Sequence, residues 1–132
     1  MNTLSNNFLR LGVLFALCGV ALGYGMGASG DHTLATVHAH INLLGWVSMF
    51  LYGLFYRAVP AAAAGLLPRL HFWCAVLGFV IMIPALAIKI LALDGLEAAS
   101  AVGLIAGPTL VVLGMLLAAV IIFRATGARA AA

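Results

Sequence analysis

Apolar residues fill four long stretches of the chain, at about residues 8–28, 34–57, 70–92 and 99–123. Each stretch reaches the roughly 20 residues that an α-helix needs to cross the hydrocarbon core of a bilayer. The breaks between them, "GASGDHT", "RAVPAAAAGLLPR" and "ALDGLEAAS", carry glycine, proline and charge, which are turn signals. The pattern predicts an all-α fold, a single domain over residues 1–132 that is an integral membrane bundle of four transmembrane helices.

The composition agrees with a membrane protein. Hydrophobic residues make up 66% of the 132 residues and charged residues 7%, whereas about a quarter of the residues of a soluble domain are charged. The basic residues behind the net charge of +3 are too few to grip a nucleic-acid backbone, so we expect the lipid bilayer as a partner and no nucleic acid. Arg10 and the apolar run after it resemble a signal peptide, but we expect this run to be retained as a span. The two cysteines lie in different runs and are expected to be unpaired packing residues.

Arginines and acids alternate between the loops. The acids, Asp31, Asp94 and Glu97, all lie in the first and third breaks. The arginines lie in the N-terminal segment, the middle break and the C-terminal tail, at positions 10, 57, 69, 124 and 129. Alternate loops of an up-and-down bundle share a side, so the positive-inside rule places both termini in the cytoplasm. Lys89, near the outer end of the third run, is the exception and can snorkel to the interface.

Two histidines, His38 and His40, stand at the head of the second run. Successive helix residues turn by about 100°, so these side chains diverge by about 200° at heights that differ by only about 3 Å. They cannot ligate one metal ion together, and they suit a helix that stands between two sites. The flank of His38 continues through polar and aromatic positions, at Asn42, Gly45, Met49, Tyr52 and Tyr56. The flank of His40 is an apolar wall of Leu44, Val47, Leu51 and Leu54, with Thr36 one turn outward.

Haem is the cofactor that suits this pair best. Zinc or copper needs several converging ligands, whereas haem needs one or two axial imidazoles and an apolar slot. Thr36 or Asn42 can hydrogen-bond a ring nitrogen and fix its tautomer. Glycines at positions 19, 23 and 27, and again at 103 and 107, either let helices pack closely or leave a slot for a flat cofactor. The simpler interpretation of the histidines is that both lie near the interface and bond water or backbone.

The remaining histidines are expected to play other parts. His71 opens the third run on the cytoplasmic side, too far from His38 and His40 to join their site across a core of about 30 Å. We expect an interfacial role for it, with a second site near Trp73 as the alternative. His32 follows Asp31 and is expected to be a solvated loop or cap residue.

The segment "VHAHINLLGWVSMFLYGLFYRAVP" resembles the histidine-bearing helix of the haem–copper oxidase superfamily, which includes cytochrome oxidases, nitric oxide reductases and NnrS-type haem proteins. The most specific part of the resemblance is "HAHINLLGW" followed by "YGLFYR" and a proline. A second stretch, "RLHFWCAVLGFVIMIPAL", resembles the superfamily more weakly. The match covers about one third of the chain. The resemblance implies a bundle of twelve helices in three arcs of four, in which a His-x-His pair serves two different haems. This chain then corresponds to one four-helix arc.

The chain also departs from that superfamily. The oxidases and nitric oxide reductases need a non-haem metal centre with further histidines or a carboxylate, yet this chain has 4 histidines and no acid inside any predicted span. One protomer cannot build that centre, so we do not carry an enzymatic activity over. If three copies assemble about a three-fold axis, His38 of one chain can face His40 of the next at each interface. We therefore favour a homotrimer, with a dimer as the main alternative.

These observations predict a multi-pass protein of the bacterial inner membrane that binds b-type haem (heme). His38 and His40 are its expected axial ligands, to two different haems at protomer interfaces. The full set of expected cofactor-binding residues is His38, His40, Thr36, Asn42 and Gly45. Two axial histidines favour electron transfer, while a single one favours gas binding. The alternative function is a cofactor-free assembly or structural subunit of a respiratory complex.

Overall fold

A computed structural model describes residues 3–130 of the chain, with side chains up to residue 127. It consists of helices throughout, and no strand occurs among the described residues. The elements in chain order are α1 (Thr3–Ser29), α2 (Ala35–His40), η1 (Ile41–Ser48), α3 (Met49–Ala58), η2 (Pro60–Ala63), α4 (Leu66–Leu91) and α5 (Glu97–Ala130). Segments α2, η1 and α3 follow one another without a break, so the predicted four-helix bundle is confirmed.

Three of these helices are long and apolar enough to cross a membrane: Thr3–Ser29, Leu66–Leu91 and Glu97–Gly127. The second predicted span corresponds to α2, η1 and α3 together, which a π-helical stretch divides into shorter pieces. The helices extend beyond the predicted apolar runs at several ends, since helix formation does not stop where hydropathy falls. The chain thus has the helices of a membrane protein.

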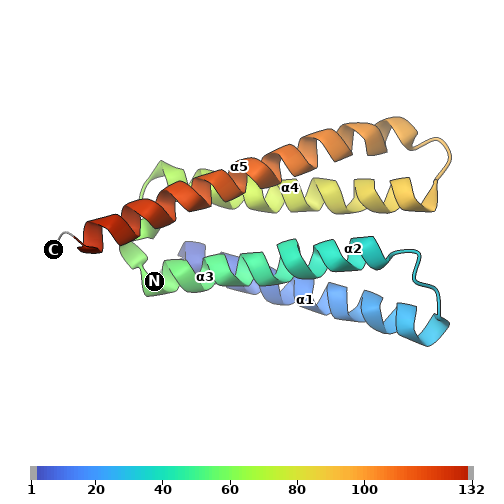
Figure 1. Cartoon of the computed structure of the whole chain (residues 1–132), viewed down its shortest axis with the longest axis horizontal. Coiled ribbons are helices and arrows are strands. Elements are labelled where there is room, and N and C mark those ends of the chain that lie inside the picture. The colour runs from blue at the N-terminus through green and yellow to red at the C-terminus, as the bar shows by residue number, and fades with distance from the viewer. Residues whose placement is uncertain (1–2, 131–132) are drawn as a thin grey trace.

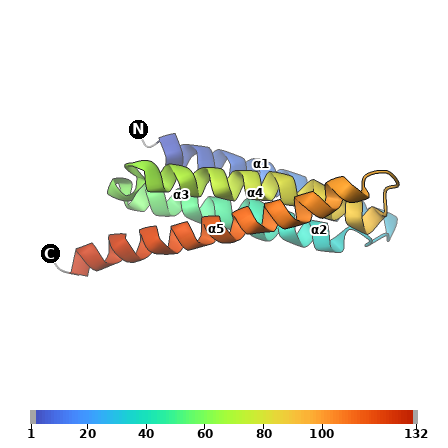
Figure 2. The same cartoon turned by 90° about the horizontal axis from the view of Figure 1, so that it is seen from above.

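The bundle is made of two antiparallel hairpins that lie side by side (Figures 1 and 2). The first hairpin pairs α1 with α2, η1 and α3, and the second pairs α4 with α5. Helices approach closely within each hairpin because glycines remove side chains from the contact. A Cβ atom at Gly12 would lie 3.1 Å from the backbone nitrogen of Phe50, and one at Gly107 would lie 2.7 Å from that of Met82.

Contact between the two hairpins is sparser and is mostly aromatic. Phe8 of α1 lies edge-to-face with Phe72 of α4, their ring centroids 4.9 Å apart, and Phe15 meets Phe79 at 4.4 Å. Large apolar side chains on the outer surfaces remain exposed on every long helix, as a lipid-facing surface requires. The cysteines, Cys18 and Cys74, are both unpaired, as expected.

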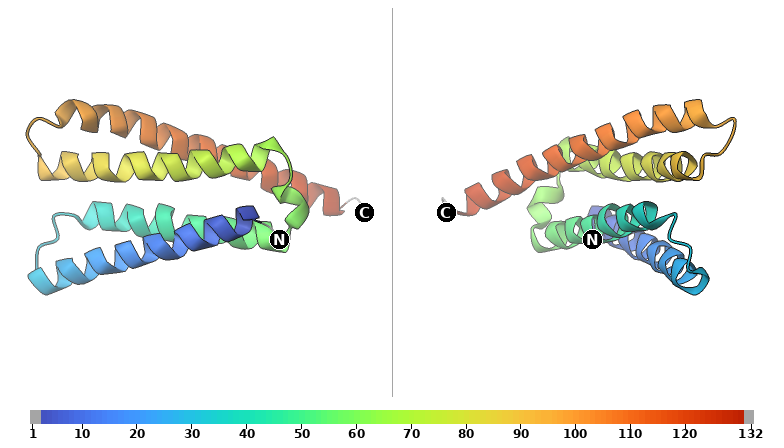
Figure 3. Two further views of the ribbon diagram at one scale, coloured as in Figure 1. Left: turned by 180° about the vertical axis from the view of Figure 1, so that it is seen from behind. Right: turned by 45° about the vertical axis from the view of Figure 1, so that its right-hand side comes forward.

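The arginines and the acids lie at opposite ends of the bundle, as the sequence predicts, and Lys89, beside Asp94 and Glu97, is the expected exception. The loops at residues 30–34 and 92–96, which hold or adjoin Asp31, Asp94 and Glu97, lie at one end (Figure 1). The start of α1, the 59–65 linker and the end of α5 lie at the other end, which we call the arginine end (Figure 3). It carries Arg57, Arg69 and Arg124, with Arg10 about two turns into α1. The side chain of Arg129 lies outside the described residues.

Candidate functional site around His38 and His40

The half-buried ring of His38 lies between α2 and α1. Its Nδ1 atom is 2.9 Å from the backbone oxygen of Gly19 on α1. The ring also contacts the backbone at Gly23, where a Cβ atom would lie 2.6 Å from Cε1 of His38. The imidazole therefore occupies the space that Gly23 leaves open and reaches the backbone oxygen of Gly19.

The ring of His40 stays with its own helix. Its Nδ1 atom is 2.8 Å from the backbone oxygen of Thr36, one turn earlier. No hydrogen bond of its Nε2 atom to another described residue is present. The ring is partly exposed and lies above exposed Val47, Leu51 and Leu54.

These two contacts have the same consequence for both rings. A carbonyl oxygen only accepts, so each Nδ1 must carry the proton that it donates. The neutral imidazole then has its lone pair on Nε2, which is the atom left to bind a metal. A ring N–H bonded to a backbone carbonyl is the usual arrangement behind a metal-ligating histidine.

Asn42 lies one turn after His38 and contacts both α1 and the ring. Its Nδ2 atom donates to the backbone oxygen of His38 at 2.9 Å and lies 3.3 Å from each nitrogen of the His38 ring. An atom equally distant from both ring nitrogens is not aligned with the lone pair of either, and 3.3 Å exceeds the usual hydrogen-bond length. We therefore assign Asn42 a packing contact with the imidazole, which leaves Nε2 of His38 without a strong partner.

Thr36 and Gly45, the other two expected site residues, have different roles from those expected. The sequence suggested a hydrogen bond from the Thr36 hydroxyl and a cofactor slot at Gly45. Thr36 positions His40 through its backbone oxygen, and its exposed side chain takes no part. Gly45 is buried, and a Cβ atom there would lie 2.6 Å from Cζ of Phe79. Its lack of a side chain accommodates that aromatic ring across the hairpin interface.

The glycine stripes of α1 and α5 act mainly in helix packing. Cβ atoms at Gly19 and Gly23 would collide with Asn42 and His38, and one at Gly103 would lie 2.6 Å from Cβ of Ala85. Gly27 is different, because nothing lies within 4 Å of a Cβ atom there. Within a single chain the stripes are thus filled by protein side chains, except at Gly27.

A π-helix, η1 (Ile41–Ser48), begins directly after His40. The wider turn leaves backbone oxygens without their α-helical partners, and the hydroxyl of Ser48 donates to one of them, at Leu43, over 2.8 Å. π-Helical turns are rare and occur frequently at functional sites. The His38 flank faces the interior, where Met49 and Tyr56 are buried. On the His40 flank, Val47, Leu51 and Leu54 are exposed as expected, whereas Leu44 packs against the buried core.

The expected interfacial position of His71 is wrong, because its side chain is only 1% exposed and lies in the protein interior. Its Nδ1 atom is 2.8 Å from the hydroxyl of Tyr56, and its buried Nε2 atom has no hydrogen-bond partner among the described residues. Phe8 and Tyr52 enclose the ring, with centroids 5.2 and 4.4 Å away. The His71 ring is buried because the second hairpin packs against the first. No local sequence pattern around residue 71 predicts this burial. His32 lies in an exposed loop, as expected, with Nδ1 3.0 Å from the oxygen of Gly30.

Within residues 3–130, no three histidine, cysteine, aspartate or glutamate side chains come together as a metal-binding group. Comparison with known protein families, curated proteins and solved structures finds no match.

Proposed function

We propose that this chain is a membrane protein that binds b-type haem, with Nε2 of His38 and Nε2 of His40 as axial ligands to two different haems. The observation that carries the proposal is the pair of Nδ1 contacts to the backbone oxygens of Gly19 and Thr36, at 2.9 and 2.8 Å. Both contacts fix the tautomer that presents Nε2 to a metal. The π-helix that follows supports a functional role for the same segment.

The two rings require haem to lie between protomers. They point to different flanks of one helix, so one chain cannot place both on the same iron. His40 is on the outer surface above an apolar wall of exposed side chains, which suits the face of a porphyrin shared with a neighbour. We therefore propose a homotrimer in which His40 of one chain and His38 of the next serve each haem. The His38 ring is only half-buried beside α1, so its exposed side is the part that would face the neighbouring chain.

The arrangement favours electron transfer. A haem held by two imidazoles has no open axial position, and when bound it supplies one-electron redox chemistry. If each haem receives only one histidine, gas binding is the function. For either function we propose that the protein lies in the bacterial inner membrane with the arginine end in the cytoplasm, as the positive-inside rule suggests. We propose no enzymatic activity.

A cofactor-free assembly or structural subunit is the second candidate, and one observation favours it. The space beside Gly19 and Gly23 is filled by Asn42 and His38, so a haem cannot enter between α1 and α2 without displacing them.

The visible absorption spectrum of the purified protein tests the proposal. We expect a Soret band that shifts on reduction in the wild type and in His32→Ala, whose ring lies in the exposed loop. We expect the band to be lost or altered in His38→Ala and His40→Ala. A preparation that stays colourless when haem is supplied during expression would refute haem binding and favour the structural subunit.

The trimer is tested separately by native mass spectrometry in detergent. The expected species is three chains with bound haem. A haem-loaded species of one or two chains, with no trimer, would rule out the proposed interface while leaving haem binding intact.

A further inference from the structure

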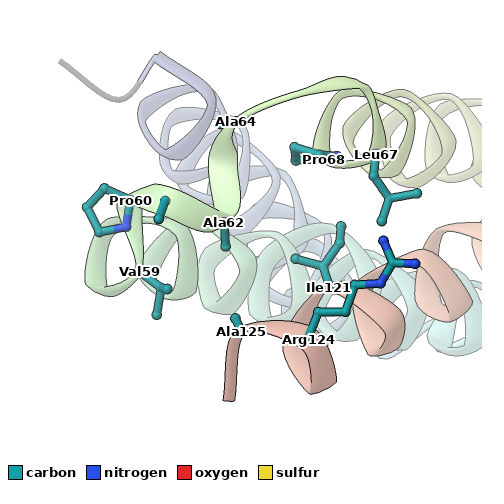
Figure 4. A pocket seen from close by; sticks show the side chains of 10 residues that line it. Val59, Pro60, Ala62, Ala64, Leu67, Pro68, Ile121, Arg124 and Ala125 are labelled. Atoms are coloured by element: carbon teal, nitrogen blue, oxygen red, sulfur yellow. The ribbon is translucent and has the colours of Figure 1, made fainter. Parts of the chain in front are cut away.

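A groove of about 510 Å³ opens at the arginine end, between the linker and the last turns of α5 (Figure 4). The linker and the start of α4 form one side, and Ile121, Arg124 and Ala125 of α5 form the other. The complete lining is Val59, Pro60, Ala61, Ala62, Ala64, Leu67, Pro68, Ile121, Arg124 and Ala125. All of these side chains are apolar except one, the arginine.

Arg124 is the single charged group of this groove. Its guanidinium end points toward Leu67 on the opposite wall (Figure 4). None of the chain's acids is near, because Asp31, Asp94 and Glu97 lie at or beside the loops of the other end. Arg57 at the same end differs, since it donates a hydrogen bond to Oδ1 of Asn6 over 2.6 Å. Arg124 makes no hydrogen bond or ion pair with another described residue, so its donors are available to a molecule in the groove.

An exposed tryptophan at the same end of the bundle indicates that the groove lies near the depth of lipid headgroups. Trp73, which is 56% exposed, lines a second groove with Arg69 on the other face of η2. Tryptophan is enriched where a helix passes from hydrocarbon to headgroups. A cation at this level beside an apolar surface matches a molecule with an anionic head and a hydrocarbon tail.

We propose that this groove binds an anionic phospholipid, with its phosphate on the guanidinium of Arg124 and the start of an acyl chain against Ile121, Leu67 and the linker. Arginine suits phosphate because its planar fork donates two parallel hydrogen bonds. The apolar lining favours a lipid over free phosphate, because free phosphate has no hydrocarbon chain to contact the lining. An apolar segment of a second copy would leave the arginine unpaired, so the charge favours the lipid.

Native mass spectrometry of the full-length protein, with phosphatidylglycerol or phosphatidylcholine added to the detergent, tests this site. We expect wild type to retain phosphatidylglycerol preferentially. Arg124→Gln should weaken that retention by about ten-fold, because the charge-assisted hydrogen bonds from the guanidinium to the phosphate are lost. Ala125→Phe, which fills the groove and keeps the charge, should weaken it as well. Arg57→Gln removes the same charge at the same end but outside the groove, and it should bind as wild type does.

Four results would overturn the proposal. Equal weakening by Arg57→Gln and Arg124→Gln would mean that retention reflects the general charge of this end. Equal retention of the two lipids would mean that the groove does not recognise an anionic headgroup. Loss of phosphatidylglycerol on adding millimolar inorganic phosphate would mean that the site binds phosphate without the acyl chain. A change in the number of chains per particle in Ala125→Phe, without a change in lipid, would assign the groove to a second copy. Haem binding plays no part in any of these readouts.

Discussion

Gly23→Ala provides the sharpest test of how α1 holds His38. The new Cβ atom would lie 2.6 Å from Cε1 of the His38 ring, closer than real Cβ contacts come. The ring cannot turn away freely, because its Nδ1 atom is bonded to Gly19 on the same helix at 2.9 Å. Either the two helices separate or the hydrogen bond breaks.

The magnitude follows from opposing effects. Overpacking a close contact costs about 1–3 kcal/mol, and losing the hydrogen bond costs about 1 kcal/mol more. Replacing glycine by alanine inside a helix recovers about 0.5–1 kcal/mol. We expect Gly23→Ala to lower the free energy of unfolding by about 1–3 kcal/mol and to reduce the haem absorbance per chain, because His38 is displaced.

Gly27→Ala is the matched control. It lies one turn further along the same stripe of α1, and nothing is within 4 Å of its Cβ position. We expect it to be neutral or to stabilise the protein by up to about 1 kcal/mol, from the helix effect alone. Unfolding in detergent, followed by tryptophan fluorescence, compares the two variants. If Gly23→Ala were as stable as Gly27→Ala, the close contact between α1 and the His38 ring would be refuted.

Two further predictions concern the arginine end and the topology. Tyr56→Phe should destabilise the protein by about 1–3 kcal/mol in chemical unfolding, because it leaves a second nitrogen of the buried His71 ring unpaired. Tyr52→Phe should cost less, since its hydroxyl makes no hydrogen bond to the described residues, and equal costs would contradict this account. In a background without native cysteines, a membrane-impermeant thiol reagent added outside cells should label a cysteine at Ser29 but not one at Ala64. The reverse labelling would invert the proposed orientation.

The helices themselves were predictable from the sequence, as was the segregation of charge. A run of about 20 apolar residues has few folded alternatives to a helix, because its backbone groups must be satisfied internally in lipid. Four such runs joined by short loops then bring Asp31, Asp94 and Glu97 to one end, whatever the packing between helices. The divergence of His38 and His40 was equally accessible, since it depends only on the turn of a helix.

The contacts of each ring were decided by the tertiary structure. The sequence marks Gly19 and Gly23 as places where a helix can approach, but only the pairing of α1 with α2 puts His38 against them. His71 shows the same limit, because its burial comes from Phe8 and Tyr52 in the other hairpin, far away along the chain. The π-helix at Ile41–Ser48 has no signal in the apolar pattern either. Local periodicity determines the direction in which a side chain leaves its helix, whereas its neighbours depend on which helices pack together.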